Sequence, residues 1–473
     1  MVKNNSLKRN AILNIIYKLS SMIFPLIVYP YVSRILLAEY LGKVTFFSNI
    51  ASYGMLIGSL GISTYGIRAV AKVRDDKNNL SKTVKELLLI NTVITSLVLI
   101  CLLTSIIWVD KFRSNLSLFI ISIVQIAIAP LSMEWLYGGL EQYDYITKRA
   151  ILFKLLSLVL IFTFIHTMDD YVKYALIMAI GYVGNYICNL VYSRKYVSLK
   201  TRGRLEVKKH LKPTLTLFAS LLAISVYTSL DSLMLGFIDG DNAVGLYDVA
   251  VKAKTVILSL VNAISGVLMP RLSYYVANGD EQSYKETLKK SIKIILMISI
   301  PLTLFFMIEA LDCILILGGE HYKAAVPCMV ILMPILLISG FSNITGNQIL
   351  IPHGLEKYYT KAVLFGAVID IVLNVILMPG YGIYGAAIAT LVAELVQMSI
   401  QTFYSRDYLK DRFDIGVIVK IVIFAVIATI VVALLRTVLN INPLVNISIS
   451  FIVFFGIYGL LLWSFKVLKQ ENI

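Results

Sequence analysis

The sequence contains little charge, few cysteines and few histidines. Only 15% of its 473 residues are charged, against about 25% in an average soluble protein. Its four cysteines are isolated in or at the edge of apolar runs, and its four histidines fall at the ends of apolar runs or between them. This spacing excludes a disulfide framework and a cysteine or histidine metal site. The cysteines are Cys101, Cys188, Cys313 and Cys328.

Signatures of ATP hydrolysis and of common hydrolases are also missing. The sequence has no GxxxxGK[ST] loop, no HExxH and no GxSxG. No connection between apolar runs is long enough for a soluble domain or a glycosyl-transfer site. We therefore predict that the protein is not an enzyme, holds no cofactor or metal, and is a secondary carrier. The sequence leaves open whether a coupling ion, H⁺ or Na⁺, drives it.

Apolar residues dominate what is present, at 58% of the chain. A membrane-spanning helix needs about 20 mostly apolar residues, and hydropathy predicts an all-α integral membrane protein with fourteen transmembrane helices. The basic start of the chain has no cleavage site after it, so the first span is expected to be retained. The predicted spans are residues 10–37, 44–67, 84–109, 115–138, 146–167, 171–193, 213–238, 244–270, 291–309, 324–350, 358–378, 382–404, 414–438 and 444–465.

Lysine and arginine are distributed unevenly between the predicted connections. Of the 43 basic residues, 32 fall in one alternating set of connections and termini, and 7 fall in the opposite set. Cytoplasmic loops carry the excess of positive charge in membrane proteins. We therefore predict that both termini are cytoplasmic, in a bacterial cytoplasmic membrane. The net charge of +15 then reflects topology and contact with the bilayer, not binding to nucleic acid.

An internal repeat relates the first six spans to the next six. GLEQY at residues 139–143 recurs as GLEKY at 354–358, and the pair Gly42 and Arg68 recurs 203 residues later in the chain. Repeats of six spans enter the membrane in the same sense, so the two lobes would be related by an axis along the membrane normal and would enclose a cavity. We predict an N-lobe at residues 1–195, a basic cytoplasmic linker at 196–212, a C-lobe at 213–406 and two additional helices at 407–473.

The eighth span carries charge on one polar face. Asp248 and Lys252 begin this stripe, and Lys254 lies about 200° around the helix from Lys252 on an apolar face. A charge inside a span costs roughly 2.5–3.5 kcal/mol on insertion scales, so it is rarely retained without a use. Lys252 is the predicted cavity residue, with a structural ion pair to Asp248 as the alternative. The stripe continues through Thr255, Ser259, Asn262 and Gly266.

Other intramembrane charges are weaker predictions. Lys18 lies on a polar stripe of the first span, where snorkelling to the interface is equally consistent with the pattern. Asp231 in the seventh span is either a coupling-ion carboxylate or a counter-charge for a lysine. Arg34, Arg68 and Arg271 lie at span ends, where interface anchoring is the alternative. Glu134, Asp370, Glu394 and Lys420 have no matching polar stripe.

Four blocks of sequence carry a family resemblance. They are STYGIRAVAKVRDD at residues 63–76, EWLYGGLEQYDYITKR at 134–149, LDSLMLG with VGLYDVAVK and MPRLS within 230–273, and PGYGIYGAAIATLVAE at 379–394. Together they resemble the oligosaccharide flippases, which move polysaccharide repeat units, of the multidrug/oligolipid/polysaccharide exporter superfamily. The similarity covers nearly the whole chain, and the last block is its most specific part.

The resemblance implies fourteen helices in two six-helix lobes plus two. It also implies a substrate, an undecaprenyl-pyrophosphate-linked oligosaccharide flipped from the inner to the outer leaflet for capsule or O-antigen assembly. A polysaccharide polymerase and chain-length machinery are the partners it suggests. By the resemblance, Arg34, Arg68, Lys252 and Arg271 match basic positions of the family, and Asp231 matches an acidic one.

Three alternatives remain open from the residues. A multidrug exporter would favour acidic and aromatic cavity walls for organic cations, whereas the stripes here carry Lys18 and Lys252. A teichoic-acid-chain or lipid II flippase would share both fold and mechanism. A membrane-embedded polysaccharide polymerase would need a large outer loop, which the sequence lacks. The identity of the sugars, the energy source, the pathway and the oligomeric state are not encoded in any pattern we find.

Overall fold

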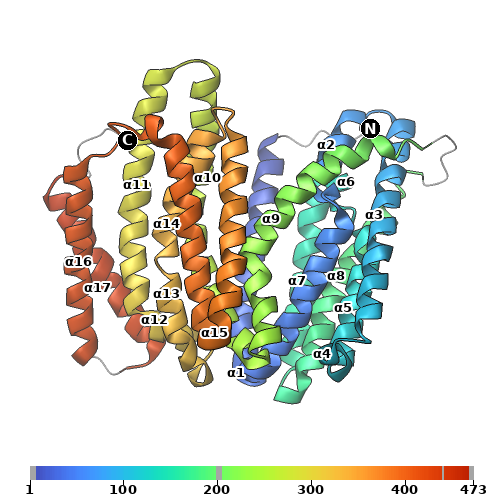
Figure 1. Ribbon diagram of the computed structural model, residues 1–473, viewed down its shortest axis with the longest axis horizontal. Helices are drawn as coiled ribbons and strands as arrows, with labels where there is room; N and C mark the ends of the chain where they lie inside the picture. The colour runs from blue at the N-terminus through green and yellow to red at the C-terminus, as the bar shows by residue number, and fades with distance from the viewer. Residues whose placement is uncertain (1–6, 199–204, 439–440, 468–473) are drawn as a thin grey trace. The chain divides into compact units, whose positions relative to one another are not determined.

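The computed structural model describes residues 7–198, 205–438 and 441–467, and every regular element in these ranges is a helix (Figure 1). The helices are α1 (Leu7–Ser59), α2 (Ile62–Val73), α3 (Lys77–Ser105), α4 (Asp110–Ser114), α5 (Leu116–Ile128), η1 (Ala129–Ser132), α6 (Glu134–Gly139), α7 (Tyr143–Phe164), η2 (Met168–Asp170), α8 (Tyr171–Ser193), α9 (Lys208–Ile238), α10 (Asp241–Ala277), α11 (Glu281–Ile308), α12 (Ala310–Leu317), η3 (Glu320–Ala325), α13 (Val326–Leu332), α14 (Ile335–Asn343), η4 (Ile344–Leu350), α15 (Glu356–Leu409), α16 (Ile415–Val438) and α17 (Pro443–Ser464).

Two of these helices are hairpins. At 1.5 Å per residue, the 53 residues of α1 and the 54 of α15 would each extend about 80 Å, far more than the roughly 30 Å hydrocarbon core. Each folds back at one non-helical residue, Leu37 (φ 58°) in α1 and Gly382 (φ 51°) in α15. With both hairpins divided, each of the fourteen predicted apolar segments coincides with helical structure, which confirms the predicted all-α membrane class.

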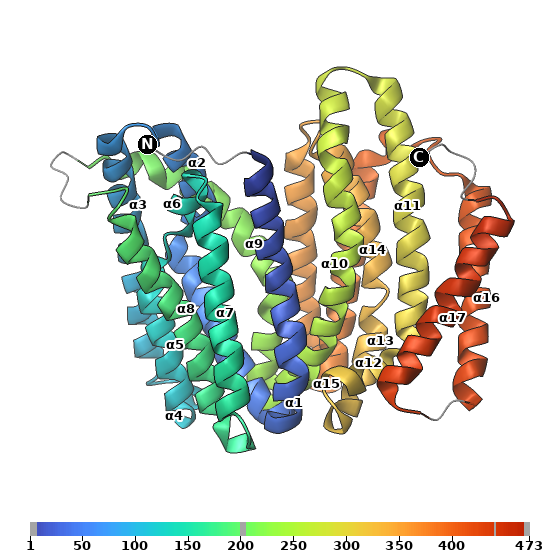
Figure 2. The ribbon, with the colours of Figure 1, turned by 180° about the vertical axis from the view of Figure 1, so that it is seen from behind.

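Hydropathy underestimates the length of two helices. The eighth and ninth spans were expected to end at residue 270 and begin at 291, but α10 and α11 continue toward each other until only residues 278–280 separate them. Figure 2 shows the two side by side, joined by this short turn. Asp280 caps α11 by accepting a hydrogen bond from the Ser283 N–H. Residues 271–290 are mostly polar, so hydropathy does not detect the ends of these helices and predicts a loop there.

Contacts divide the chain into two units, residues 1–233 and 234–473. The division falls inside α9, which is bent by 56° between Val226 and Ser229. The predicted lobe boundaries rest on the sequence repeat and stay a prediction. Residues 199–204 of the predicted linker lie outside the described part of the chain.

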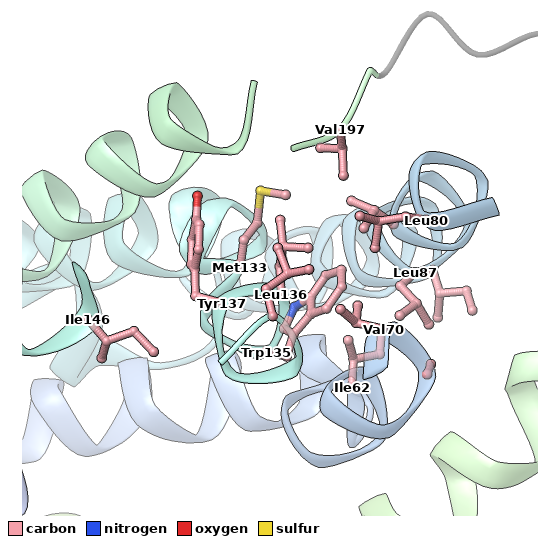
Figure 3. Close-up of a cluster of buried hydrophobic side chains, with 14 of the residues drawn as sticks. Ile62, Val70, Leu80, Leu87, Met133, Trp135, Leu136, Tyr137, Ile146 and Val197 are labelled. Atoms are coloured by element: carbon pink, nitrogen blue, oxygen red, sulfur yellow. The ribbon is translucent and has the colours of Figure 1, made fainter. Parts of the chain in front are cut away.

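A hydrophobic cluster joins α2, α3 and α6 in the first unit (Figure 3). Ile62, Val70 and Leu87 are fully buried in it, and the indole of Trp135 lies against α2. Gly66 allows this approach because a Cβ atom there would lie 2.8 Å from the indole ring. Close packing of α2 against α6 therefore depends on the absence of a side chain at Gly66.

We predict that Gly66→Ala lowers the free energy of unfolding by about 1–3 kcal/mol, since the added methyl group overpacks the indole. Thermal unfolding in detergent, followed by circular dichroism, measures the change. Gly459→Ala is the matched control because no described heavy atom would lie within 4 Å of its Cβ, and alanine is the better helix former. Equal melting temperatures for the two variants would contradict this packing.

Candidate functional site

The predicted polar stripe on α10 begins with an ion pair. Lys252 Nζ lies 3.2 Å from Asp248 Oδ1, one helical turn earlier. The Lys252 side chain is 40% exposed, whereas the Asp248 side chain is 10% exposed. The second oxygen, Asp248 Oδ2, is buried with no hydrogen-bond partner among the described residues. The aspartate thus holds the ammonium group in place on a lysine side chain that stays partly exposed.

The stripe continues onto a neighbouring helix. Asn262 is exposed on α10, and its Oδ1 accepts a hydrogen bond of 2.7 Å from Asn343 Nδ2 at the end of α14. Asn343 Oδ1 in turn accepts one of 2.6 Å from Asn347 Nδ2 in the π-helix η4. Two asparagines four residues apart are the sequence signal for this extension, and the predicted stripe did not include them. We call Asp248, Lys252, Thr255, Asn262, Asn343 and Asn347 the polar track.

The π-helix η4 is anchored on its other face. Gln348 Nε2 donates to Ser265 Oγ of α10 at 3.0 Å, and Gln348 Oε1 accepts from Ser291 Oγ of α11 at 2.6 Å. Tyr284 Oη also donates to the Gln348 carbonyl. A π-helix widens the helical turn and commonly occurs at functional sites. Here it leaves Asn347 beside Asn343 while Gln348 fixes the segment to two other helices.

Arg271 does not join Lys252 in one pocket. Both lie on α10, but 19 residues separate them, which is about 28 Å along the helix axis. Arg271 is exposed near the end of α10, where its Nε donates to Tyr275 Oη at 3.0 Å. Lys254, as predicted, is absent from the polar track, and it has no hydrogen-bond or ion-pair partner in the described part of the chain.

The predicted residues of the first unit are also separated in depth. Arg34 is exposed three residues before the fold-back at Leu37, and its guanidinium donates to the Pro30 carbonyl. Arg68 is exposed on α2 with no partner among the described residues, and the second arm of α1, about 33 Å long, separates the two arginines. Asp231 is 3% exposed on α9. The Lys18 side chain lies outside the described residues.

A buried network that the sequence did not reveal joins α6, α7 and α8. Arg149 lies near the start of α7, within the predicted fifth span, and is only 5% exposed. Its Nη2 donates to Glu134 Oε1 at 2.7 Å and its Nε to Asn185 Oδ1 at 2.8 Å. Its Nη1 donates to Asn189. Glu134 therefore has a structural partner and a half-exposed carboxylate.

The described end of the predicted linker is docked on α3. Glu86 is fully buried and accepts hydrogen bonds from His210 Nε2 at 2.8 Å and from the Glu206 N–H at 2.7 Å. Lys209 Nζ lies 3.1 Å from the same carboxylate. The ammonium groups of Lys82 and Lys209 lower the pKa of Glu206, which lies on the loop before α9. Part of the linker's basic charge is therefore used in ion pairs that hold α9 to α3.

Comparison with known proteins gives family and fold. The model of a family described as polysaccharide biosynthesis protein matches residues 7–276, and a model described as MatE matches residues 217–376. A relative from Escherichia coli (strain K12), described as a proposed O-antigen transporter, is 24% identical over 85% of this chain and 97% of its own length. One from Shigella dysenteriae with the same description is 26% identical over 82% of this chain and 98% of its own.

Solved structures with the same fold include two transporters. The lipid II flippase MurJ in an inward closed conformation matches 97% of this chain and all of its own, with a TM-score of 0.75 and 16% identity. A multidrug resistance MATE family transporter in an inward-facing conformation matches 85% of this chain and 98% of its own, with a TM-score of 0.65 and 16% identity. These similarities establish the arrangement of helices alone.

We predict that Arg149→Gln lowers the free energy of unfolding by about 2 kcal/mol or more, because it leaves Glu134, the half-buried Asn185 and the buried Asn189 without their shared donor. Lys148→Gln is the control, since Lys148 is 73% exposed in its ion pair with Asp144 and such pairs contribute about 0–1 kcal/mol. Chemical unfolding in mixed micelles gives both values. Similar losses for the two variants would show that the network is not structural.

Proposed function

The chain belongs to the polysaccharide biosynthesis protein family of multi-span flippases, and on that premise we propose that it flips undecaprenyl-pyrophosphate-linked oligosaccharide repeat units. The movement is from the inner to the outer leaflet of a bacterial cytoplasmic membrane, for capsule or O-antigen assembly. The observation that carries the proposal is the polar track with its accessible ammonium group, in a chain that matches O-antigen transporters along nearly their full length.

The chemistry of the polar track suits such a head group. A pyrophosphate cannot enter hydrocarbon without compensation of its charge, and Lys252 supplies a cation about 16 Å along α10 from its start. Thr255, Asn262 and Asn347 add hydroxyl and amide groups that can exchange hydrogen bonds with sugar hydroxyls. Asp248 holds the Lys252 ammonium group in position before the substrate arrives. The prenyl chain stays in lipid while the head group follows the polar track.

The remaining basic residues act at other depths. With both termini cytoplasmic, Arg68 and Arg271 lie toward the cytoplasmic side and meet the pyrophosphate first, and Arg34 lies toward the outer side. The distance of about 28 Å between Arg271 and Lys252 means that one pyrophosphate contacts them in succession. Lys18 belongs to the same cationic set. Asp231 acts as a counter-charge or as the carboxylate for a coupling ion, H⁺ or Na⁺.

Two related functions share this fold. The MatE match over residues 217–376 favours a multidrug exporter as the second candidate, but the accessible charge on the polar track is a lysine, which repels organic cations. Lipid II or a teichoic-acid chain would present the same pyrophosphate or phosphate chemistry to Lys252. Identifying the lipid-linked species that accumulates when the gene is deleted separates these substrates. A polysaccharide polymerase and chain-length machinery would then act on the flipped product.

We predict that Lys252→Gln reduces surface polymer at least tenfold when it replaces the wild-type gene, with lipid-linked oligosaccharide accumulating on the inner leaflet. The variant no longer compensates the charge of the pyrophosphate. Raising the barrier to transport by about 1.4 kcal/mol, through the loss of this one charged contact, slows transport tenfold. Polymer is measured by immunoblot, and the lipid-linked species by mass spectrometry.

The control is Lys254→Gln, which removes the same charge two residues away and should leave the polymer unchanged. The double variant Asp248→Asn with Lys252→Gln removes both ions of the pair, so it restores charge balance without restoring transport. If this double variant produced normal polymer, Lys252 would serve only to neutralise Asp248, and the substrate assignment would be wrong.

A further inference from the structure

A second cluster of buried charge lies in the second unit, outside the polar track. Glu309 separates α11 from α12 and is 0% exposed, and Asp312 lies in the first turn of α12. Arg436 reaches them from the last turn of α16, with Nη2 donating to Asp312 Oδ2 at 3.2 Å and Nη1 lying 3.7 Å from Glu309 Oε2. Asn446 of α17 donates to the same Asp312 oxygen. Four helices therefore meet at this cluster.

Glu309 is the unusual member. Neither of its carboxylate oxygens has a hydrogen-bond partner among the described residues, although both are fully buried. Arg436 gives its Nη1 hydrogen bond to the Ile308 carbonyl at the end of α11 instead. An ionised carboxylate left without hydrogen bonds in a protein interior is strongly destabilising. A protonated carboxyl group avoids most of that cost and gains an O–H that it can donate.

The balance of charge around Glu309 also favours a protonated carboxyl group. The groups facing Glu309 are Asp312 and Cys313 from α12, Arg436 from α16, and the uncharged Asn446 and Ser450 from α17. Two ionised carboxylates and one guanidinium would leave a net charge of −1 in the interior. Two carboxylates in one site cannot readily both ionise, and one bound proton makes the cluster neutral.

We propose that Glu309 and Asp312 form a proton-binding site, balanced by Arg436, that fastens α16 and α17 to α11 and α12. The proton is held between the two carboxyl groups, with Glu309 as the donor and ionised Asp312 as the acceptor. Asp312 is already the group that receives hydrogen bonds from Arg436 and Asn446, so it is the better anion. Loss of the proton leaves uncompensated negative charge against α17 and weakens the attachment of both helices.

The position of the site determines which solution supplies the proton. The cluster lies at the end of α16 and the beginning of α17, joined by residues 439–442. Under the predicted topology this connection is on the outer side of the membrane. The site therefore responds to external pH.

Infrared spectroscopy of the purified protein tests for the bound proton. At about pH 6, where exposed glutamates are ionised, the wild-type protein should show one buried carboxylic C=O band that disappears in Glu309→Gln. Asp312→Asn should abolish the band too, because the remaining Glu309 can ionise beside Arg436. Glu320→Gln is the control, since the Glu320 side chain is 70% exposed and follows the opposite end of α12. A wild-type band that survives in both variants overturns the proposal.

Stability gives an independent measurement. The folded cluster keeps a proton that an unfolded chain releases near pH 4–5, so the stability it contributes is present at low pH and is lost as pH rises. We expect the melting temperature of wild-type and Glu320→Gln protein to fall by about 2–4 °C more between pH 6 and pH 9 than that of Glu309→Gln. If Glu309→Gln does not fold, Asp312→Asn serves the same comparison. Identical pH profiles for all variants would exclude the site.

Discussion

The lipid bilayer offers no hydrogen bonds, and this constraint governs the whole structure. Backbone groups in a span must be paired within it, so the described chain is helical throughout. Side-chain charges must likewise find partners inside the protein. Arg149 is surrounded by Glu134 and two asparagines, Glu86 by His210 and Lys209, and Arg436 by Asp312 and Glu309. In each case the charge joins two or more helices.

Lys252 differs from these structural charges in one respect. Its partner Asp248 is on the same helix, one turn away, whereas the three structural charges are paired with side chains of other helices. The asparagines of the polar track link α10, α14 and η4 through hydrogen bonds that are exposed or partly buried, whereas those of the Gln348 side chain are buried. On the proposed function, binding and structural roles are carried by neighbouring residues of the same segments.

The sequence predicted the helices well because hydropathy and helical length are local properties. The position of Lys252 on a polar face and the exclusion of Lys254 are local too, and both follow from a 3.6-residue period. Partners distant in sequence could not be predicted from one chain, as with Arg436, which meets Glu309 across 127 residues. The fold-back at Leu37 has no local signal either, since leucine rarely adopts positive φ and the prolines of α1, Pro25 and Pro30, precede it. The contacts of Arg149 with Asn185 and Asn189, 36 and 40 residues away, could not be predicted for the same reason.

The separation of about 28 Å between Arg271 and Lys252 on α10 has a consequence for pharmacology. If both residues bind the pyrophosphate, as proposed, a soluble phosphate analogue can occupy only one of the two sites at a time and gains the affinity of a single charged contact. A competitive inhibitor of high potency would then need two anionic groups joined by a stiff spacer of matching length, because effective concentration falls to nearly zero when a linker cannot span its sites. For the same reason, small anions in the cytoplasm would compete weakly with the lipid head group.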